Sequence, residues 1–297
     1  MLLPEEVRGN VERALADLGL GRRIETSVPV AGGCINSGAR IETDSGETLF
    51  LKWNPSSPPG MFEAEAEGLA ALAEADVLRV PTSFAWSDEA TASWLLMEFI
   101  PQGPSNHEAE SALGRSLAKL HAHRGNERFG WARDNWIGSL RQRNTLSEDW
   151  GGFWREHRIE PQVAQARRAE LVRYAVFDVL LDLIPGALSD VERPQLVHGD
   201  LWSGNRFVSD HGEPVLIDPA VYLGHGEVDL AMSELFGGFG EDFYDAYEDV
   251  QAIPSAYTAY RRDLYQLYYL LVHVNLFGGA YEAPALRAAR RIVSEVG

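Results

Sequence analysis

The residues that could do chemistry lie in one short segment and in one aspartate that follows it. The segment Val197–Asn205 reads VHGDLWSGN, and Asp218 comes thirteen residues after Asn205. In kinases a carboxylate at the position of Asp200 meets the acceptor hydroxyl, an amide one loop later turns back to Mg²⁺, and a second aspartate reaches that metal from the next strand. Mg²⁺ prefers such hard oxygen ligands. The spacing predicts phosphoryl transfer with Asp200 as the catalytic carboxylate and with Asn205 and Asp218 as metal ligands.

Each of these aspartates taken alone would also fit an ordinary hairpin with solvated carboxylates. Their occurrence together in this order favours the catalytic interpretation. Trp202 stands two residues past Asp200, where an indole either lines the acceptor pocket or props the loop. Both interpretations stay open at this point. We name Trp202 and Asp200 as the predicted substrate-binding residues.

Lys52 ends an apolar run, fourteen residues past Gly38. The chain holds 26 Lys and Arg residues, of which Lys52 and Lys119 are the lysines. A lysine inside an apolar run therefore indicates a site that needs a compact point charge. We predict that Lys52 binds the α- and β-phosphates of ATP and pairs with Glu65 of the following helix, with Glu63 as the second choice. A solvated cation at a strand end is the alternative.

A glycine-rich turn precedes that run. Gly33-x4-Gly38 resembles the start of a Walker loop, but Ala39-Arg40 stands where Lys-Ser/Thr is required, so we do not expect a Walker NTPase. We predict a β-hairpin whose backbone amides face the nucleotide, with a simple connecting loop as the alternative. Backbone groups at the end of a later strand should bind adenine. The predicted nucleotide contacts besides Lys52 and Glu65 are Gly33, Cys34, Ile35, Asn36, Ser37, Met97, Glu98, Phe99 and Ile100.

Cys34 is the one cysteine of the chain. This count excludes an internal disulfide framework and suits a reducing compartment. A thiol inside a glycine loop could also be reactive, which would make the protein redox-sensitive. A small side chain packed under the loop is the alternative.

Periodicity and turn residues predict an α+β, protein-kinase-like fold of two lobes. Residues 1–100 read as a small β-rich lobe with one main helix, and a Pro/Gly-rich break at 101–104 separates it from a larger, mostly helical lobe, residues 101–297. A β segment at 196–218 interrupts the helices of that lobe. In the first lobe we expect helices at 4–18 and 61–74 and strands at 27–30, 39–43, 48–53 and 93–99. In the second we expect helices at 108–121, 149–157, 161–183 and 257–277.

Composition narrows the classes of partner. A net charge of −18 argues against nucleic acid, because little would offset phosphate repulsion. The first residues have neither the basic start nor the apolar stretch of a signal peptide. The apolar segment Leu264–Phe277 is interrupted by polar residues and is too short to span a bilayer, so we expect a buried helix and no membrane contact. The simplest interpretation is a cytoplasmic protein, and its oligomeric state is not predicted.

The connection after the metal-binding aspartate is short, because ten residues, Pro219–Val228, separate it from Asp229. Protein kinases need a longer segment there to dock a peptide, and Asp-Pro-Ala replaces their Asp-Phe-Gly turn. We therefore expect a small acceptor. His225, Glu227 and Asp229 do not have the spacing of a zinc hydrolase motif. We expect Asp229 to stand at a helix start and His198 to brace the catalytic loop.

Three strings carry a more specific signal: HGDLWSGN at 198–205, DPA-x-Y-x-GH-x-E-x-DLAM at 218–232, and LFGGF at 235–239. With further matches from Gly32 to Tyr247, the sequence resembles the fructosamine kinase family; Ser37 and Gly226 depart from its pattern. The resemblance implies ATP- and Mg²⁺-dependent phosphorylation of a ketosamine, of fructosamine, ribulosamine or erythrulosamine type, at its 3-hydroxyl. The acceptor would be a small molecule or a glycated protein side chain, and the product would release the free amine.

Three other functions remain open from the residues alone. A kinase of another small molecule, such as an aminoglycoside, an amino sugar or choline, would keep the whole catalytic set. An atypical protein kinase would have to work with the short 219–228 connection. A nucleotide-binding module without activity would not need the complete Lys–Asp–Asn–Asp set, which argues against it.

Overall fold

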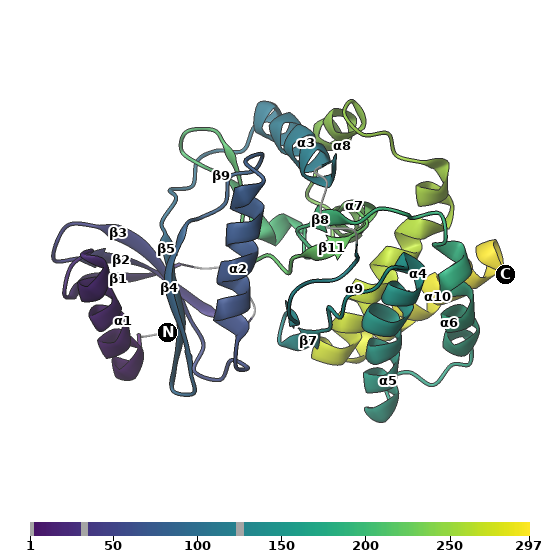
Figure 1. Cartoon of the computed structure of the whole chain (residues 1–297), viewed down its shortest axis with the longest axis horizontal. Coiled ribbons are helices and arrows are strands. Elements are labelled where there is room, and N and C mark those ends of the chain that lie inside the picture. Colours follow the sequence, from purple (N-terminus) through teal and green to yellow (C-terminus); the bar gives the residue numbers. More distant parts are fainter. Residues whose placement is uncertain (1–2, 31–34, 123–127) are drawn as a thin grey trace. The chain divides into compact units, whose positions relative to one another are not determined.

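The computed structural model describes residues 3–30, 35–122 and 128–297, which form two compact units (Figure 1). The first unit consists of Met1–Asn106 together with Gly204–Pro219, and the second of His107–Ser203 together with Ala220–Gly297. Strands dominate the first unit and helices the second, which agrees with the predicted α+β class. The domain boundary predicted between residues 100 and 101 stays a prediction.

The described part of the first unit holds a five-stranded antiparallel sheet in the order β1-β2-β3-β5-β4. The segment at 44–47 joins two of these strands, with Gly46 at a φ of +86°, a conformation that favours glycine. Each predicted strand of this lobe is present, and β4 adds a strand that the sequence pattern did not predict. The bounds are β1 Ile24–Val30, β2 Ser37–Thr43, β3 Thr48–Trp53, β4 Ser83–Glu89 and β5 Ala92–Glu98.

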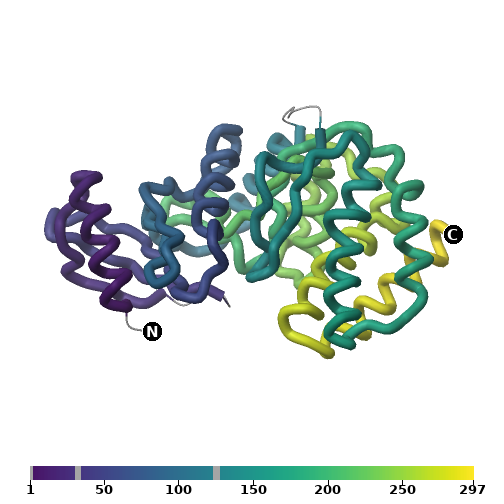
Figure 2. The backbone as a smooth tube through the Cα atoms, turned by 60° about the horizontal axis from the view of Figure 1, so that its bottom comes forward, coloured from purple at the N-terminus to yellow at the C-terminus, as the bar shows by residue number. Residues whose placement is uncertain are grey.

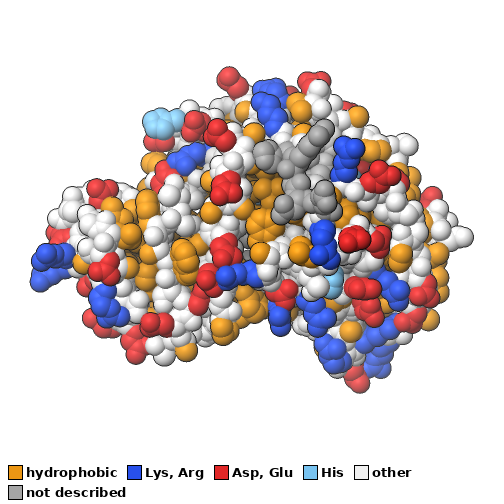
Figure 3. Space-filling model, viewed as in Figure 1, with side chains coloured by type: hydrophobic (Ala, Val, Ile, Leu, Met, Phe, Trp, Pro, Cys, Tyr) orange, Lys and Arg blue, Asp and Glu red, His pale blue; other side chains and the backbone are white. Residues whose placement is uncertain are grey.

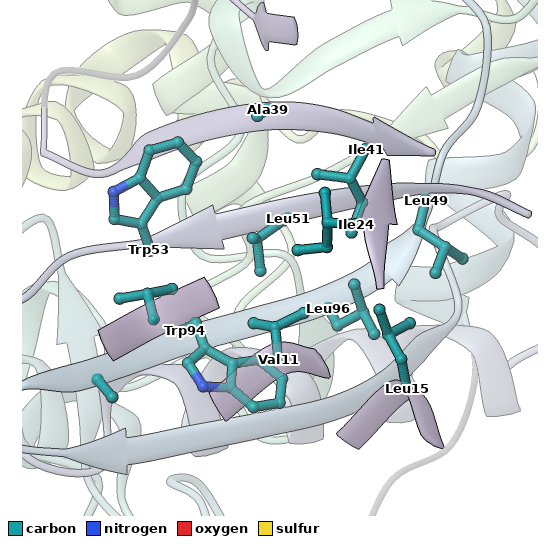
Figure 4. Close-up of a cluster of buried hydrophobic side chains, with 12 residues drawn as sticks. Val11, Leu15, Ile24, Ala39, Ile41, Leu49, Leu51, Trp53, Trp94 and Leu96 are labelled. Carbon is teal, nitrogen blue, oxygen red and sulfur yellow. The ribbon is translucent and has the colours of Figure 1, made fainter. Parts of the chain in front are cut away.

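Helix α1, Glu5–Leu18, covers one face of this sheet. Its side chains Val11 and Leu15 meet Leu51 and other apolar side chains of the strands in a continuous core (Figure 4). The helix stops where Gly19 adopts a φ of +72°. Leu18 is 43% exposed, unlike the other apolar residues of this face. It is the final residue of the helix and lies at the end of the packed surface.

Alternation along β3 directs neighbouring residues to opposite faces of the sheet. Leu51 and Trp53 belong to the core under α1. Lys52 between them points to the other face, where helix α2, Met61–Glu74, contacts β4 and β5. Figure 1 shows α1 and α2 on opposite sides of the sheet. This two-sided arrangement is what brings the lysine to the helix that carries Glu65.

A two-stranded hairpin completes the first unit. It pairs β9, Arg206–Val208, with β10, Pro214–Leu216, inside the segment predicted to be β-structure. The hairpin is joined to the earlier part of the unit by backbone hydrogen bonds from Leu216 N to Arg79 O (2.9 Å) and from Gly103 N to Val208 O (2.8 Å). The bond at Leu216 holds the open end of the hairpin, where Asn205 and Asp218 follow the strands, and the bond at Val208 holds the end next to the turn.

The second unit is built from helices, with short strand pairs between them. Helices α6, α9 and α10 pack side by side (Figure 2), and most of α9 is buried, as predicted for 264–277. Among the described residues no helix is long and apolar enough to cross a membrane. The helices are α3 His107–Ala122, α4 Trp150–Trp154, α5 Glu160–Arg168, α6 Val176–Ala187, α7 Glu227–Leu235, α8 Glu241–Glu248, α9 Arg262–Phe277 and α10 Glu282–Val296, and the strands are β6 Asn135–Ile137, β7 Leu140–Gln142, β8 Gln195–Val197 and β11 Tyr222–Gly224.

The single helix predicted at 161–183 is wrong, because the chain breaks between α5 and α6. Glu170 adopts a φ of +59° directly after α5, and left-handed backbone ends a helix. The guanidinium of Arg167 then joins the two helices through two hydrogen bonds to Asp178, of 2.7 and 2.8 Å. Neither glycine nor proline marks this break in the sequence. The predicted helix at 149–157 is present as α4 followed by a π-helical turn, Arg155–Ile159.

Candidate active site

A buried ion cluster in the first unit surrounds Lys52. Its Nζ donates to both carboxylate oxygens of Glu65 at 2.8 Å and to Asp218 Oδ1 at 2.9 Å. Lys52 is 7% exposed and Glu65 is 8% exposed, while the Asp218 side chain keeps 34%. The predicted pairing of Lys52 with Glu65 is therefore present, and the solvated strand-end cation is not what the fold contains.

Burial and charge act in opposite directions on these groups. Burial lowers the pKa of Lys52, but the carboxylates of Asp218 and Glu65 together raise it above its usual range. Burial raises the pKa of Glu65 to about 7, although the ammonium of Lys52 opposes that rise. The cluster thus keeps a positive charge on Lys52 beside the partly exposed carboxylate of Asp218. A lysine ammonium of this kind is a compact point charge that can bind phosphate oxygens.

Asp218 is held in an unusual conformation next to Asn205. Its φ is +55°, which a non-glycine residue rarely adopts. Asn205 Nδ2 donates to the Asp218 carbonyl at 3.4 Å, and Ile217 N donates to the Asn205 carbonyl at 3.0 Å. This hydrogen bond holds the Asn205 side chain beside the backbone of Asp218. A carboxylate and an amide oxygen fit Mg²⁺, which takes its other ligands from water and phosphate.

The two strands that flank the glycine loop in sequence pair as a hairpin, as predicted. Strands β1 and β2 pair antiparallel on either side of it, with Val30 opposite Gly38. Gly33 and Cys34 lie outside the described residues, so the nucleotide contacts and the redox role predicted for them stay predictions. Ser37 begins β2, and Asn54 Nδ2 donates to the Ile35 carbonyl (3.2 Å) and to Asn36 Oδ1 (3.1 Å). Asn54 was not among the predicted site residues.

The predicted adenine-binding segment spans the end of β5. Met97 is buried and lies in register with Phe50 and Ser83, and Glu98 N donates to Thr82 O at 2.9 Å. The Glu98 carboxylate bonds to Arg79. Phe99 and Ile100 follow the strand, beyond these sheet bonds, so the backbone available to a base would come from them.

The catalytic loop after β8 belongs to the second unit and is held from two sides. The buried carboxylate of Asp229 accepts hydrogen bonds from His198 N at 2.7 Å and from Gly199 N at 2.8 Å. The Tyr269 hydroxyl donates to the Gly199 carbonyl at 2.7 Å. His198 Nδ1 in turn accepts from the backbone N of Asp200 at 3.3 Å. The bracing role predicted for His198 and the position of Asp229 at the start of α7 are confirmed.

Gly199 is required by this loop. Its φ is +82°, and a Cβ added there would overlap the carbonyl oxygen of Ala220. Two residues further on, Trp202 N donates to the Asp200 carbonyl at 3.1 Å. Asp200 and Trp202 are both half-buried. The structure places both on one tight turn, and the two interpretations of Trp202 stay open.

A buried polar network holds the chain that follows Asp218, and sequence reasoning gave it no role. Asn135 Nδ2 donates to the Val221 carbonyl at 2.7 Å, and Gln142 Nε2 donates to Asn135 Oδ1 at 2.8 Å. Arg158 donates to Asn144 Oδ1 at 2.8 Å. All four residues lie within the stretch from Gly32 to Tyr247 that carries the family resemblance, but their spacing gave no reason to bring them together.

Arg158 is fully buried without a carboxylate partner among the described residues. Its guanidinium carbon lies 4.1 Å from the ring centre of Tyr222 and 4.7 Å from that of Phe153. Ring faces and carbonyl oxygens thus stabilise a charge that would otherwise be costly to bury.

The other ionisable residues near α7 form ion pairs and hydrogen bonds rather than a metal site. Among the described residues no group of three or more His, Cys, Asp and Glu is placed to bind a metal. Glu227 accepts from Arg261 at 2.8 Å, and the His225 ring bonds to the Tyr265 hydroxyl at 2.8 Å. Glu227 and His225 thus have hydrogen-bond partners within the second unit.

Replacing Asp229 with Asn should destabilise the protein and slow turnover. One amide oxygen cannot accept both loop amides as the carboxylate does, and its NH₂ group would face a donor. We expect a loss of about 2–3 kcal/mol in the free energy of unfolding, measured by urea denaturation, and a lower kcat. The exposed Asp249→Asn is the matched control. Unchanged stability of the Asp229 variant would contradict the bracing role.

His225 should make the protein less stable in mild acid. Burial lowers the pKa of His225 to about 3, so the unfolded chain binds a proton below about pH 6.5 and the folded chain does not. The free energy of unfolding should fall from pH 6.5 downward by up to about 1.4 kcal/mol per pH unit. We expect a smaller slope than this maximum because the His225 side chain keeps 15% exposure. Burial raises the pKa of Glu227 to about 7, which acts oppositely between pH 4.5 and 7.

The difference between wild type and His225→Gln isolates the histidine from Glu227. The variant should lose less stability than wild type between pH 6.5 and 4.5, as measured by thermal unfolding at each pH. Parallel curves for the two proteins would show that His225 is protonated in the folded state as easily as in the unfolded chain.

Comparison of the sequence with known proteins identifies one family. The model of the family described as fructosamine kinase matches residues 10–295. The chain belongs to the fructosamine kinase family. A Synechocystis protein named "Probable ketoamine kinase" is 42% identical over 264 residues, covering 89% of this chain and 88% of the relative. The Arabidopsis thaliana protein named chloroplastic protein-ribulosamine 3-kinase is 42% identical over 262 residues, covering 86% and 79%.

Solved structures confirm the kinase-like fold of this family member. A crystal structure from Haemophilus somnus, assigned as a fructosamine-3-kinase, superposes with a TM-score of 0.87 at 28% identity and covers 95% of this chain and 96% of the other. The ADP-bound aminoglycoside phosphotransferase APH(2'')-Ib superposes with a TM-score of 0.64 at 13% identity, covering 98% and 99%. The second likeness concerns the fold alone.

Proposed function

We propose that this fructosamine kinase family member transfers the γ-phosphoryl group of ATP to the 3-hydroxyl of a ketosamine. The observation that carries the proposal is the buried lysine between Glu65 and Asp218, with Asn205 bonded to the backbone of Asp218. The relatives named as a ketoamine kinase and a protein-ribulosamine 3-kinase support the acceptor class. The sugar of the ketosamine, and whether the amine is free or part of a protein, belong to the proposal.

In this proposal each group has one task. Lys52 holds the α- and β-phosphates, while Asn205 and Asp218 would hold Mg²⁺, which supplies charge neutralisation on the phosphates when bound. Asp200 orients the acceptor hydroxyl and accepts its proton as transfer completes. Positioning and electrostatic stabilisation provide most of the acceleration. Backbone groups at Phe99 and Ile100 would bind adenine.

The product chemistry explains a use for the reaction. A phosphate on C3, the carbon next to the C2 carbonyl of a ketosamine, is a good leaving group once a proton is removed from C1 on the other side of that carbonyl. Loss of the C3 phosphate, with removal of a proton next to the carbonyl, gives an unsaturated sugar that can release the amine by hydrolysis. The proposed role is therefore deglycation of amines or of protein side chains.

The charge of the protein surface bears on which partners it can bind. On the face drawn in Figure 3, basic side chains gather over the end of α5, but acidic side chains lie among them. This mixture, with the net charge of −18, favours a small or glycated acceptor over nucleic acid. We propose a cytoplasmic protein, consistent with its single cysteine.

The test measures ADP formation with Mg-ATP across ribulosamines, erythrulosamines and fructosamines of lysine, with choline and aminoglycosides alongside, and then locates the phosphate by NMR. We expect ADP release that depends on a ketosamine and phosphate on C3. Turnover of choline or an aminoglycoside with none of a ketosamine would replace the proposal with that other small-molecule kinase. ADP release without any acceptor would likewise count against it.

A further inference from the structure

An aromatic cluster in the second unit is not used by the site described above. It consists of Phe236 after α7, His273 and Phe277 on α9, and Tyr281. The His273 ring centre lies 4.8 Å from that of Phe236, 4.9 Å from that of Tyr281 and 5.5 Å from that of Phe277. Phe236 is 41% exposed and Phe277 is 54% exposed. Adjacent large rings left so exposed are typical of binding surfaces.

Helix α9 ties one side of this cluster to the catalytic loop. His273 lies one turn after Tyr269, and its Nδ1 bonds to the Tyr269 carbonyl at 2.8 Å. The Tyr269 hydroxyl reaches the Gly199 carbonyl at 2.7 Å. The same helical turn therefore supports the residue before Asp200 and carries the central ring of the cluster.

The glycine turn after α7 ties the other side to the same loop. A Cβ added at Gly238 would lie 2.5 Å from the Ser203 Cβ, and Phe236 stands two residues before Gly238. Gly199 and Ser203 flank Asp200 and Trp202 in sequence. The aromatic cluster is thus connected to both ends of the loop that carries the catalytic carboxylate.

The cluster offers ring faces without a charged group of its own. Burial lowers the pKa of His273, although the hydrogen bond to the Tyr269 carbonyl opposes that shift. Faces of this kind attract an organic cation and take up methylene groups. A ketosamine carries a secondary ammonium on C1, two carbons from the reacting 3-hydroxyl. When the amine is that of lysine, a stem of methylene groups follows.

We propose that this cluster receives the amine-bearing part of the acceptor, with the methylene stem of a glycated lysine against Phe236 and Phe277. The inference rests on the proposed function. An enclosed pocket would restrict the acceptor to short amines, whereas rings that are about half exposed let the chain beyond the stem continue into solvent. The subsite would therefore accept lysine ketosamines whose chain continues beyond the stem.

The experiment compares two acceptors that carry the same sugar, one on the ε-amine of a lysyl peptide and one on methylamine. The measured quantity is the ratio of kcat/KM for the two. We expect Phe277→Ala and Phe236→Ala each to lower this ratio about tenfold, mainly through KM, because part of the methylene contact is lost. Phe277→Trp should keep the ratio, as should Trp86→Ala, which removes an exposed ring from the first unit.

The outcomes separate the two proposals. If wild type phosphorylates both acceptors and the alanine variants leave the ratio unchanged, the subsite is refuted while the proposed function stands. The same holds if the ratio falls equally in Trp86→Ala, since the effect would not be local to the cluster. If wild type phosphorylates neither acceptor, the proposed function itself is refuted and the subsite with it.

Discussion

Asp200→Asn should reduce kcat by at least about 10³-fold while leaving the affinity for ATP nearly unchanged. The amide keeps the shape of the side chain but cannot accept the proton of the acceptor hydroxyl, and a general base contributes about 10²–10⁴-fold. The ATP-binding groups assigned above lie in the other unit of the chain, so the variant should still bind nucleotide. Turnover of the acceptor and equilibrium binding of an ATP analogue give the two measurements.

The exposed Asp249→Asn is the matched control for this change, because it removes a carboxylate from the same unit without touching the catalytic loop. The unfolding midpoint of the Asp200 variant should stay close to that of wild type. Near-normal turnover by a folded Asp200→Asn protein would remove Asp200 from the catalytic role and leave the assignment of the acceptor side without its central residue.

Lys52→Met should be the most damaging change on the nucleotide side, in both activity and stability. The variant loses the charge assigned to the phosphates, for which we expect a fall of about 10²–10³-fold in kcat/KM for ATP. It also leaves the buried carboxylate of Glu65 without its partner. We expect a loss of about 2–4 kcal/mol in the free energy of unfolding, reduced by the proton that Glu65 can take up.

The double variant Lys52→Met/Glu65→Gln separates these two effects. A neutral amide beside a neutral methionine removes the buried charge, so most of the stability should return while activity stays low. Urea denaturation and steady-state kinetics on the wild type, both single variants and the double variant complete the cycle. If the double variant were as unstable as Lys52→Met, the loss would come from packing rather than from an unpaired carboxylate.

The Lys52–Glu65 pair could be predicted because it depends on local rules. Strand alternation turns Lys52 away from its apolar neighbours, and the next helix follows on that face. The structure gives β3 and α2 the bounds predicted from the sequence. The catalytic spacing from Asp200 to Asp218 was equally visible, since it lies within one short stretch of chain.

What the sequence did not show depends on contacts between distant segments or on short elements. Strands β6, β7, β8 and β11 have three residues each, too few for a period to appear. The left-handed backbone of Asp218 and Glu170 has no glycine to mark it. Helix α10 buries Ala285, Ala289 and Ile292, and its small side chains give a weak apolar pattern. The network around Arg158 joins residues far apart in the chain.

The burial of Lys52 affects how readily the protein itself can be glycated. A lysine amine condenses with a reducing sugar when it is exposed and unprotonated. Lys52 is neither, because two carboxylates enclose it and its pKa is raised. Lys119, the other lysine of the chain, is exposed on α3. Arginine carries nearly all the remaining positive charge. A chain for which we propose a role in removing sugar adducts therefore offers sugars a single accessible lysine side chain.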